Sequence, residues 1–123
     1  KIASARSARD KERTILGFNS NIRNAQDPTI EDAWARFAEE SPNPLVNIAR
    51  QLIAGAQYRA PKAIRTRTLV ISALQDHLTH ASCSWDLARR FGAGVVFHDT
   101  AGHDLPMDAP EWLIDQVGFW MNN

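Results

Sequence analysis

The sequence predicts an α/β protein in which a helical first half precedes a pair of parallel strands. Three observations lead to this prediction. Apolar residues in the first half recur at helical spacing, between breaks that contain proline. Two short apolar runs follow at 68–74 and 95–98, and a helical pattern separates them. A strand–helix–strand unit forms a parallel pair through a right-handed crossover, and almost wholly apolar interiors are typical of parallel strands covered on both faces.

The composition is that of an ordinary globular domain. The chain has 123 residues, 44% hydrophobic and 23% charged, with a formal net charge of zero. A balanced charge gives no electrostatic basis for binding nucleic acid. Because no apolar run approaches the length of a membrane span and no signal-peptide pattern is present, we expect no membrane association and a cytoplasmic location. The single cysteine, Cys83, excludes an intrachain disulfide and is expected to be a small core residue.

Residues 1–61 are predicted to form a helical cap or lid. The stretch 1–13 is polar and charged and can form a frayed helix or a disordered arm. A natural chain begins with Met, which is normally removed only before a small residue, so Lys1 suggests a cut or processed piece of a longer protein. Roughly helical spacing then joins four apolar residues, Ile15, Leu16, Phe18 and Ile22.

Two further helices are expected in this cap. The first runs over about 30–40, after a break at 27–29 in which Thr29 or Asp27 can cap the helix and Pro28 lies near its first turn. The second runs over about 44–58, where Asn43 before a proline is a start signal. The apolar residues of this second helix recur every three or four positions and make it amphipathic: Leu45, Ile48, Ala49, Leu52, Ile53 and Ala56.

Residues 62–123 are predicted to form the α/β half. The helix between the strands starts near 79–82 and ends at Gly92. The last helix is expected to begin after Asp108, with that residue as its N-cap and Pro110 in its first turn. Two parallel strands alone do not make a stable sheet. We therefore expect the sheet to continue in a missing part of the protein, or in another copy of the chain through self-association at the exposed sheet edge.

Asp76 and His103 each follow the carboxyl end of a predicted strand, and sites in open α/β sheets are built at that edge. A histidine can act as a general base when a carboxylate holds its other ring nitrogen and stabilises the imidazolium that forms. Gly102 would allow the loop to approach closely. The alternative is that Asp76 caps a turn and His103 is an ordinary surface residue.

From Arg67 onward the sequence resembles the C-terminal part of an α/β-hydrolase. The run 69–78 resembles that family's penultimate strand and acid-bearing turn, and the run 100–106 resembles its histidine loop. The final helix over 108–121 also fits, and the upstream helices resemble the family's variable cap. The resemblance implies a partial α/β-hydrolase fold, with a helical cap followed by the last two parallel strands and two helices of the sheet.

The resemblance also implies a function. The family's nucleophile sits on a Gly-x-Ser-x-Gly elbow that precedes the acid and the histidine, and this sequence has no such motif. The implied protein is a C-terminal fragment of a serine-type hydrolase of ester or acyl substrates. Asp76 and His103 would be its triad acid and histidine, and the chain would be inactive without the nucleophile half. No cofactor is implied, and the partner of the intact enzyme would be a small ester-like molecule.

Leucines that flank the acid and the histidine are the candidate substrate-binding residues, namely Leu74, Leu78 and Leu105. Aromatic residues of the cap could line an apolar pocket, although core packing is the favoured interpretation of each: Phe18, Trp34, Phe37 and Tyr58.

Two other interpretations remain open. One is a metal site, which we do not favour, drawn from a cluster of ligand-type residues: Asp76, His77, His80, His98, Asp99, His103 and Asp104. The other is a non-catalytic interaction or oligomerisation module derived from the same fold, since four tryptophans are many for this length and aromatic residues are favoured at interfaces.

Overall fold

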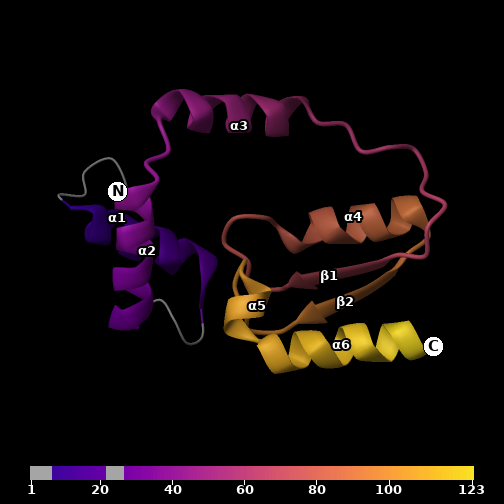
Figure 1. Ribbon diagram of the computed structural model, residues 1–123. Coiled ribbons are helices and arrows are strands. Elements are labelled where there is room, and N and C mark those ends of the chain that lie inside the picture. The colour runs from indigo at the N-terminus through magenta and orange to yellow at the C-terminus, as the bar shows by residue number, and fades with distance from the viewer. Residues whose placement is uncertain (1–6, 22–26) are drawn as a thin grey trace.

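A parallel pair of strands lies at the centre of the second half, as the sequence predicts. In the computed structural model, which describes residues 7–21 and 27–123, β1 (Leu69–Ala73) pairs with β2 (Gly94–His98), so that Ala73 lies opposite His98. Helix α4 (Ala81–Phe91) connects the strands on one face, and α6 (Pro110–Asn122) lies on the other face (Figure 1). The fold class is therefore α/β, mostly helical around a two-stranded parallel sheet.

The helices of the first half begin and end close to the expected positions. Helix α1 (Ala8–Asn19) follows an N-cap at Ser7, so the described part of the polar N-terminal stretch is helical. Helix α2 (Pro28–Glu40) begins after Asp27, whose carboxylate accepts from the Thr29 N–H at 2.8 Å. Lys1 and Ile22, which were considered in the sequence analysis, lie outside the described residues.

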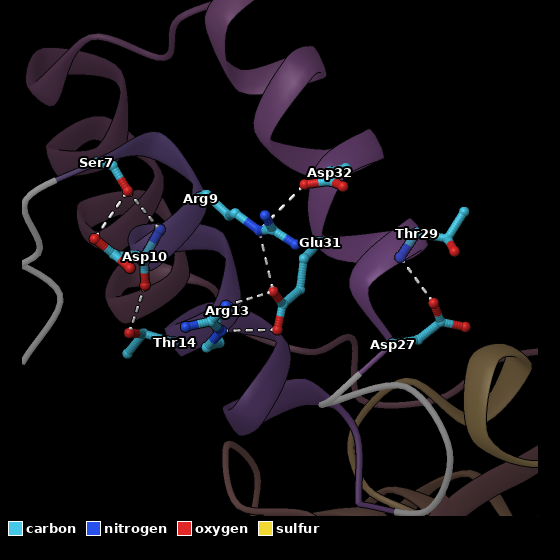
Figure 2. A network of polar contacts seen from close by, with 9 residues as sticks. All are labelled: Ser7, Arg9, Asp10, Arg13, Thr14, Asp27, Thr29, Glu31 and Asp32. Carbon is cyan, nitrogen blue, oxygen red and sulfur yellow. Dashed lines mark hydrogen bonds and ion pairs between the residues drawn. The ribbon is translucent and has the colours of Figure 1, made fainter.

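Helices α1 and α2 pack against each other around a buried carboxylate. The Glu31 side chain is 4% exposed and receives two hydrogen bonds of 2.8 Å from the Arg13 guanidinium (Figure 2). The Arg9 Nε donates to the same carboxylate at 3.4 Å. On the same helix as Arg13, the Leu16 side chain is fully buried. A bidentate arginine–carboxylate contact fixes both the distance between the two side chains and their relative orientation. It therefore sets how the two helices meet.

Helix α3 (Leu45–Gln57) differs from the expectation of a packed amphipathic helix. No residue of α3 is buried, and Leu45 and Leu52 are 82% and 70% exposed. Figure 1 shows α3 lying apart from the sheet and its covering helices. The helix starts after Pro44 with no side-chain cap, so the predicted start signal at Asn43 does not act as one. The apolar stripe exists in the sequence, but no core forms over it in the described part of the chain.

Helix α4 departs from its predicted packing in a similar way. The Cys83 side chain is exposed, which contradicts its expected place in the core. Of the residues in α4, only Ala88 is buried, and Trp85 stacks on Phe97 of β2 with ring centroids 5.2 Å apart while remaining half exposed. Gly92 ends α4 with a φ of 61°, as predicted from its glycine.

A small core lies below the carboxyl edge of the strands. Ala73 at the end of β1 packs with Ala101, Leu105 and Ala109, and Ile71 and Trp112 contact this cluster. Leu105 belongs to the short helix α5 (Leu105–Asp108), which precedes α6. The cluster thus supports the loops that leave the two strands. In the described residues no helix is long and apolar enough to cross a membrane.

The Glu31 ion pair predicts a pH-dependent stability. Hydrogen bonds from Arg13 lower the pKa of Glu31, burial opposes them, and the charges of Arg13 and Arg9 add to the lowering. A lowered pKa means that the ionised carboxylate stabilises the fold above the unfolded-state pKa, and that this contribution is lost as pH falls through the folded-state pKa. We expect Glu31→Gln to lower the urea midpoint at neutral pH, and the difference from the wild type to close in acid.

The matched control is Asp32→Asn. Asp32 also contacts Arg9, at 3.1 Å, but its side chain is 61% exposed, so its contribution is screened by water. Equal losses in the two variants, or a Glu31→Gln deficit that persists in acid, would contradict the assigned role of Glu31.

Candidate active site

The loop after β1 holds the carboxylate of Asp76 in a fixed orientation. The Leu74 N–H donates to the His98 carbonyl at 2.9 Å, which extends the strand pairing by one step. The Asp76 Oδ1 then accepts from the backbone N–H groups of Leu78 at 2.7 Å and Thr79 at 2.9 Å. With its side chain 8% exposed, Asp76 has one oxygen bound to its own loop and the other directed out of it.

The loop after β2 is turned by His98, the last residue of the strand. The His98 Nδ1 accepts from the N–H groups of Thr100 at 3.3 Å and Ala101 at 2.9 Å. Its ring meets Trp112 of α6 edge-on, with centroids 5.0 Å apart. These contacts fix the direction in which the chain leaves β2 and continues to His103.

Asp76 and His103 meet between the two loops. The Asp76 Oδ2 lies 2.8 Å from the His103 Nδ1, and the His103 side chain is 45% exposed. An ionised carboxylate can only accept, so in the neutral ring Nδ1 carries the proton and Nε2 carries the lone pair. Among residues 7–21 and 27–123, no hydrogen bond is made to Nε2. The arrangement can therefore take up a proton at Nε2 and stabilise the resulting charge through Asp76.

The pKa of Asp76 is lowered from its ordinary value. Burial is the largest influence and raises this pKa. The hydrogen bond from His103 and the backbone hydrogen bonds from Thr79 and Leu78, together with the charge of His103, lower the pKa by more. Asp76 is therefore ionised at neutral pH, as an acceptor of the Nδ1 proton must be.

A second carboxylate, Asp108, fastens the histidine loop to the end of α1. Its Oδ1 accepts from the Ser20 hydroxyl, and its Oδ2 accepts from the N–H groups of Asn21 at 2.9 Å and Gly102 at 2.7 Å. Asp108 was expected to cap the last helix, and this expectation is wrong. The N-cap of α6 is Ala109, and the 5% exposed side chain of Asp108 turns inward to these three donors.

The end of α1 also contacts the acid loop. The Asn21 Nδ2 donates to the Gln75 carbonyl at 2.8 Å, next to Asp76. The Asp104 N–H, next to His103, donates to the Asn19 carbonyl at 2.8 Å. Residues 19–21 therefore touch both loops that carry the acid–histidine pair. No local signal in the sequence identifies this segment, because its partners are distant in the chain.

The remaining candidate residues take different positions. Leu105 is 8% exposed and belongs to the core cluster below the histidine loop, whereas Leu74 and Leu78 are 49% and 54% exposed. The cap aromatics are partly or largely exposed, with Phe37 at 58% and Tyr58 at 71%. An open hollow of about 800 Å³ beside α4 is lined by neither Asp76 nor His103, so the chemistry of the pair, not this hollow, marks the site.

Two histidines of the possible metal cluster hydrogen-bond to the backbone of their own loops instead. His80 caps α4 through its Nδ1, and His98 accepts from the backbone as described above. In the part of the chain that the structure describes, no three His, Cys, Asp or Glu side chains gather closely enough to hold a metal ion. Within the same residues, no hydroxyl or thiol is hydrogen-bonded to His103.

Comparison with known proteins places the fold near a lipase. No family model and no curated protein matches the sequence. Among solved structures, the chain is similar to the crystal structure of a putative lipase (lip1) from Acinetobacter baumannii AYE, with a TM-score of 0.75 and 20% sequence identity. The similarity covers 91% of this chain and 41% of the lipase chain, so this chain spans less than half the length of that structure. At this identity the likeness shows a shared fold alone.

The close approach of Gly102 to α1 gives a prediction for the histidine loop. A Cβ at position 102 would lie 2.7 Å from the Asn19 carbonyl oxygen, which is backbone and cannot move aside alone. We expect Gly102→Ala to destabilise the chain by about 1–3 kcal/mol in urea unfolding. The control is Gly17→Ala in α1, where a Cβ meets nothing within 4 Å. That change should stabilise by about 0.5–1 kcal/mol. A Gly102→Ala variant with an unchanged free energy of unfolding would show that the Asn19 carbonyl does not lie this close to the loop.

Proposed function

We propose that this chain is the C-terminal part of a serine-type α/β-hydrolase that cleaves ester or acyl substrates. Residues 1–61 form the cap, and residues 62–123 form the last part of the catalytic core. Asp76 is the triad acid and His103 is the general base. The supporting observation is the 2.8 Å contact between Asp76 Oδ2 and His103 Nδ1, made between two loops at the carboxyl edge of parallel strands.

The proposed reaction assigns one proton transfer to each step. The serine hydroxyl attacks the ester carbonyl carbon while its proton moves to the His103 Nε2, and Asp76 stabilises the imidazolium. His103 then returns the proton to the leaving alcohol, which departs as the acyl-enzyme forms. A water molecule releases the acyl group through the same two transfers. The half-exposed imidazole of His103 leaves Nε2 accessible for these transfers.

The nucleophile and the oxyanion hole come from another part of the protein in this proposal. Support comes from the lipase-like fold, of which this chain spans 41%, and from the absence of a Gly-x-Ser-x-Gly elbow in the sequence. Leu74 and Leu78, exposed on the acid loop, are proposed to contact the substrate. Leu105, also a candidate from the sequence, is buried, and it would act on substrate only through the loop above it.

The proposal is tested first in the coding sequence upstream of Lys1, where we expect a Gly-x-Ser-x-Gly elbow after a strand. In the protein so defined, we expect hydrolysis of p-nitrophenyl butyrate. His103→Ala should lower kcat by on the order of 10⁶-fold, and Asp76→Ala by about 10⁴-fold. The chain 1–123 alone should show no turnover above background.

The control is His77→Ala, because His77 is an exposed histidine one residue from Asp76. Its loss should leave kcat within about twofold of the wild type, as expected for an exposed side chain outside the Asp76–His103 contact. Hydrolysis that survives in His103→Ala, or turnover by the chain 1–123 alone, would refute the assignment.

A second candidate function is self-association of the chain. Its support is the apolar face of α3, where Leu45, Val46, Leu52 and Ile53 are all more than half exposed. Within the described residues β1 pairs with β2 alone, so its second edge has no strand beside it. Exposed apolar surface of this kind favours association, and an unpaired strand edge can accept another strand.

We expect the isolated chain to elute as a dimer or larger species in size-exclusion chromatography with light scattering. Leu52→Glu combined with Ile53→Glu should shift it toward monomer, because burying carboxylates on that face is costly. Gln51→Glu adds charge to the same helix outside the predicted apolar stripe and should leave the oligomer intact. A monomeric wild-type chain would exclude this function.

A further inference from the structure

The end of α1 lies between the two loops that carry the acid and the histidine. Ser20 is 2% exposed, and its hydroxyl donates to Asp108 five positions after His103. The Asn19 carbonyl accepts from Asp104, the residue that follows His103. Helix α1 belongs to the region that the sequence assigns to the cap, yet its last residues are bonded directly to the histidine loop. A cap that only covered a pocket would not need these contacts.

Asp108 is the residue on which these contacts converge. A buried carboxylate is costly unless several donors meet it. Here the Ser20 hydroxyl binds one oxygen, and the backbone N–H groups of Asn21 and Gly102 bind the other. Gly102 immediately precedes His103 in the chain, so the position of its N–H group sets the position of the imidazole. Asp108 thus joins the residue before the catalytic histidine to a segment more than 80 positions earlier.

Asn21 completes the link to the acid. Its side-chain amide donates to the Gln75 carbonyl at 2.8 Å and to the Thr100 carbonyl at 3.5 Å. Gln75 precedes Asp76 by one residue, and Thr100 belongs to the histidine loop. One side chain therefore spans both of the loops that the Asp76–His103 hydrogen bond joins.

We infer that Asp108 and Asn21 are positioning residues that hold His103 at hydrogen-bonding distance from Asp76. Neither touches the reacting atoms, and both act through the loops. The inference rests on the proposed role of His103 as a base, but the geometry that it concerns can be measured without any turnover. The end of α1 is accordingly part of the catalytic apparatus and not of the cap alone.

The test uses variants that separate hydrogen bonding from charge. In Asp108→Asn the amide oxygen can take both backbone N–H groups, while the amide NH₂ donates to Ser20, whose hydroxyl turns from donor to acceptor. The loop should then stay in place. In Asp108→Ala the contacts with Ser20, Asn21 and Gly102 are all lost. Asp99→Ala, on the same loop and exposed, removes the same charge without touching α1 and is the matched control.

The readout is the tautomer of His103, measured on the chain 1–123 by long-range ¹H–¹⁵N correlation of the imidazole. The wild type, Asp108→Asn and Asp99→Ala should all carry the proton on Nδ1. Asp108→Ala should show the tautomer mixture of a free histidine, with the far-ultraviolet circular dichroism unchanged. In the longer hydrolase, Asp108→Ala should lower kcat about 10- to 100-fold, as misplacement by about 1 Å can, and Asp108→Asn should restore it.

Asn21→Ala provides a milder second test if Asp108→Ala fails to fold, because Asn21 is exposed and its backbone N–H remains. It should lower the Nδ1–H population, and Asn19→Ala, which leaves the Asn19 carbonyl in place, should not. A wild-type tautomer in every folded variant overturns the inference, as does an Asp108→Asn variant that behaves like Asp108→Ala. If the tautomers follow the prediction but the longer protein hydrolyses no ester, the proposed function fails and the positioning role stands.

Discussion

The parallel pairing of β1 and β2 is the constraint on which the candidate site depends. Because Ala73 lies opposite His98, the two strands end at the same level and their loops leave the same edge of the sheet. Asp76 is three residues beyond one end and His103 five residues beyond the other, so a single 2.8 Å hydrogen bond can join them. An antiparallel pair would send the two loops to opposite ends. The α4 crossover is what makes the parallel arrangement possible.

Features that the sequence predicts correctly are encoded by neighbouring residues. The strand ends, the Asp27 cap and the Gly92 stop each depend on a few consecutive positions, and the strand order places Asp76 and His103 at one edge. The misassigned residue, Asp108, shows the limit of such local patterns. An Asp two residues before a proline has the pattern of a helix cap, whereas its hydroxyl donor, Ser20, is 88 positions away. The exposure of α3 has the same origin, because periodicity identifies an apolar face but not what covers it.

Two buried carboxylates, Glu31 and Asp108, are each met by several hydrogen-bond donors, which offset the cost of burying a charge. Glu31 is neutralised by the guanidinium of Arg13, so its contribution depends on charge and is sensitive to pH. The donors to Asp108 include a hydroxyl and two backbone N–H groups, which carry no net charge but have fixed directions. The arginine–carboxylate contact joins two helices, and the backbone donors to Asp108 help to set the path of the histidine loop.

The polar groups of the candidate site are therefore hydrogen-bonded within the chain, whereas some outer surfaces of the described residues lack a packing or pairing partner. Every oxygen of Asp76 and Asp108 has a donor within the chain. His98 fixes the start of the histidine loop, and Asn21 ties the two loops to one another. The face of α3 and the outer edge of β1, by contrast, have neither packing nor pairing in the described residues. In the proposed hydrolase this division would separate the acid–base pair from the rest of the active site. The acid–base pair can be fixed by contacts within this chain, so the remainder of the fold has to supply only the nucleophile, the oxyanion hole and the cover for these faces.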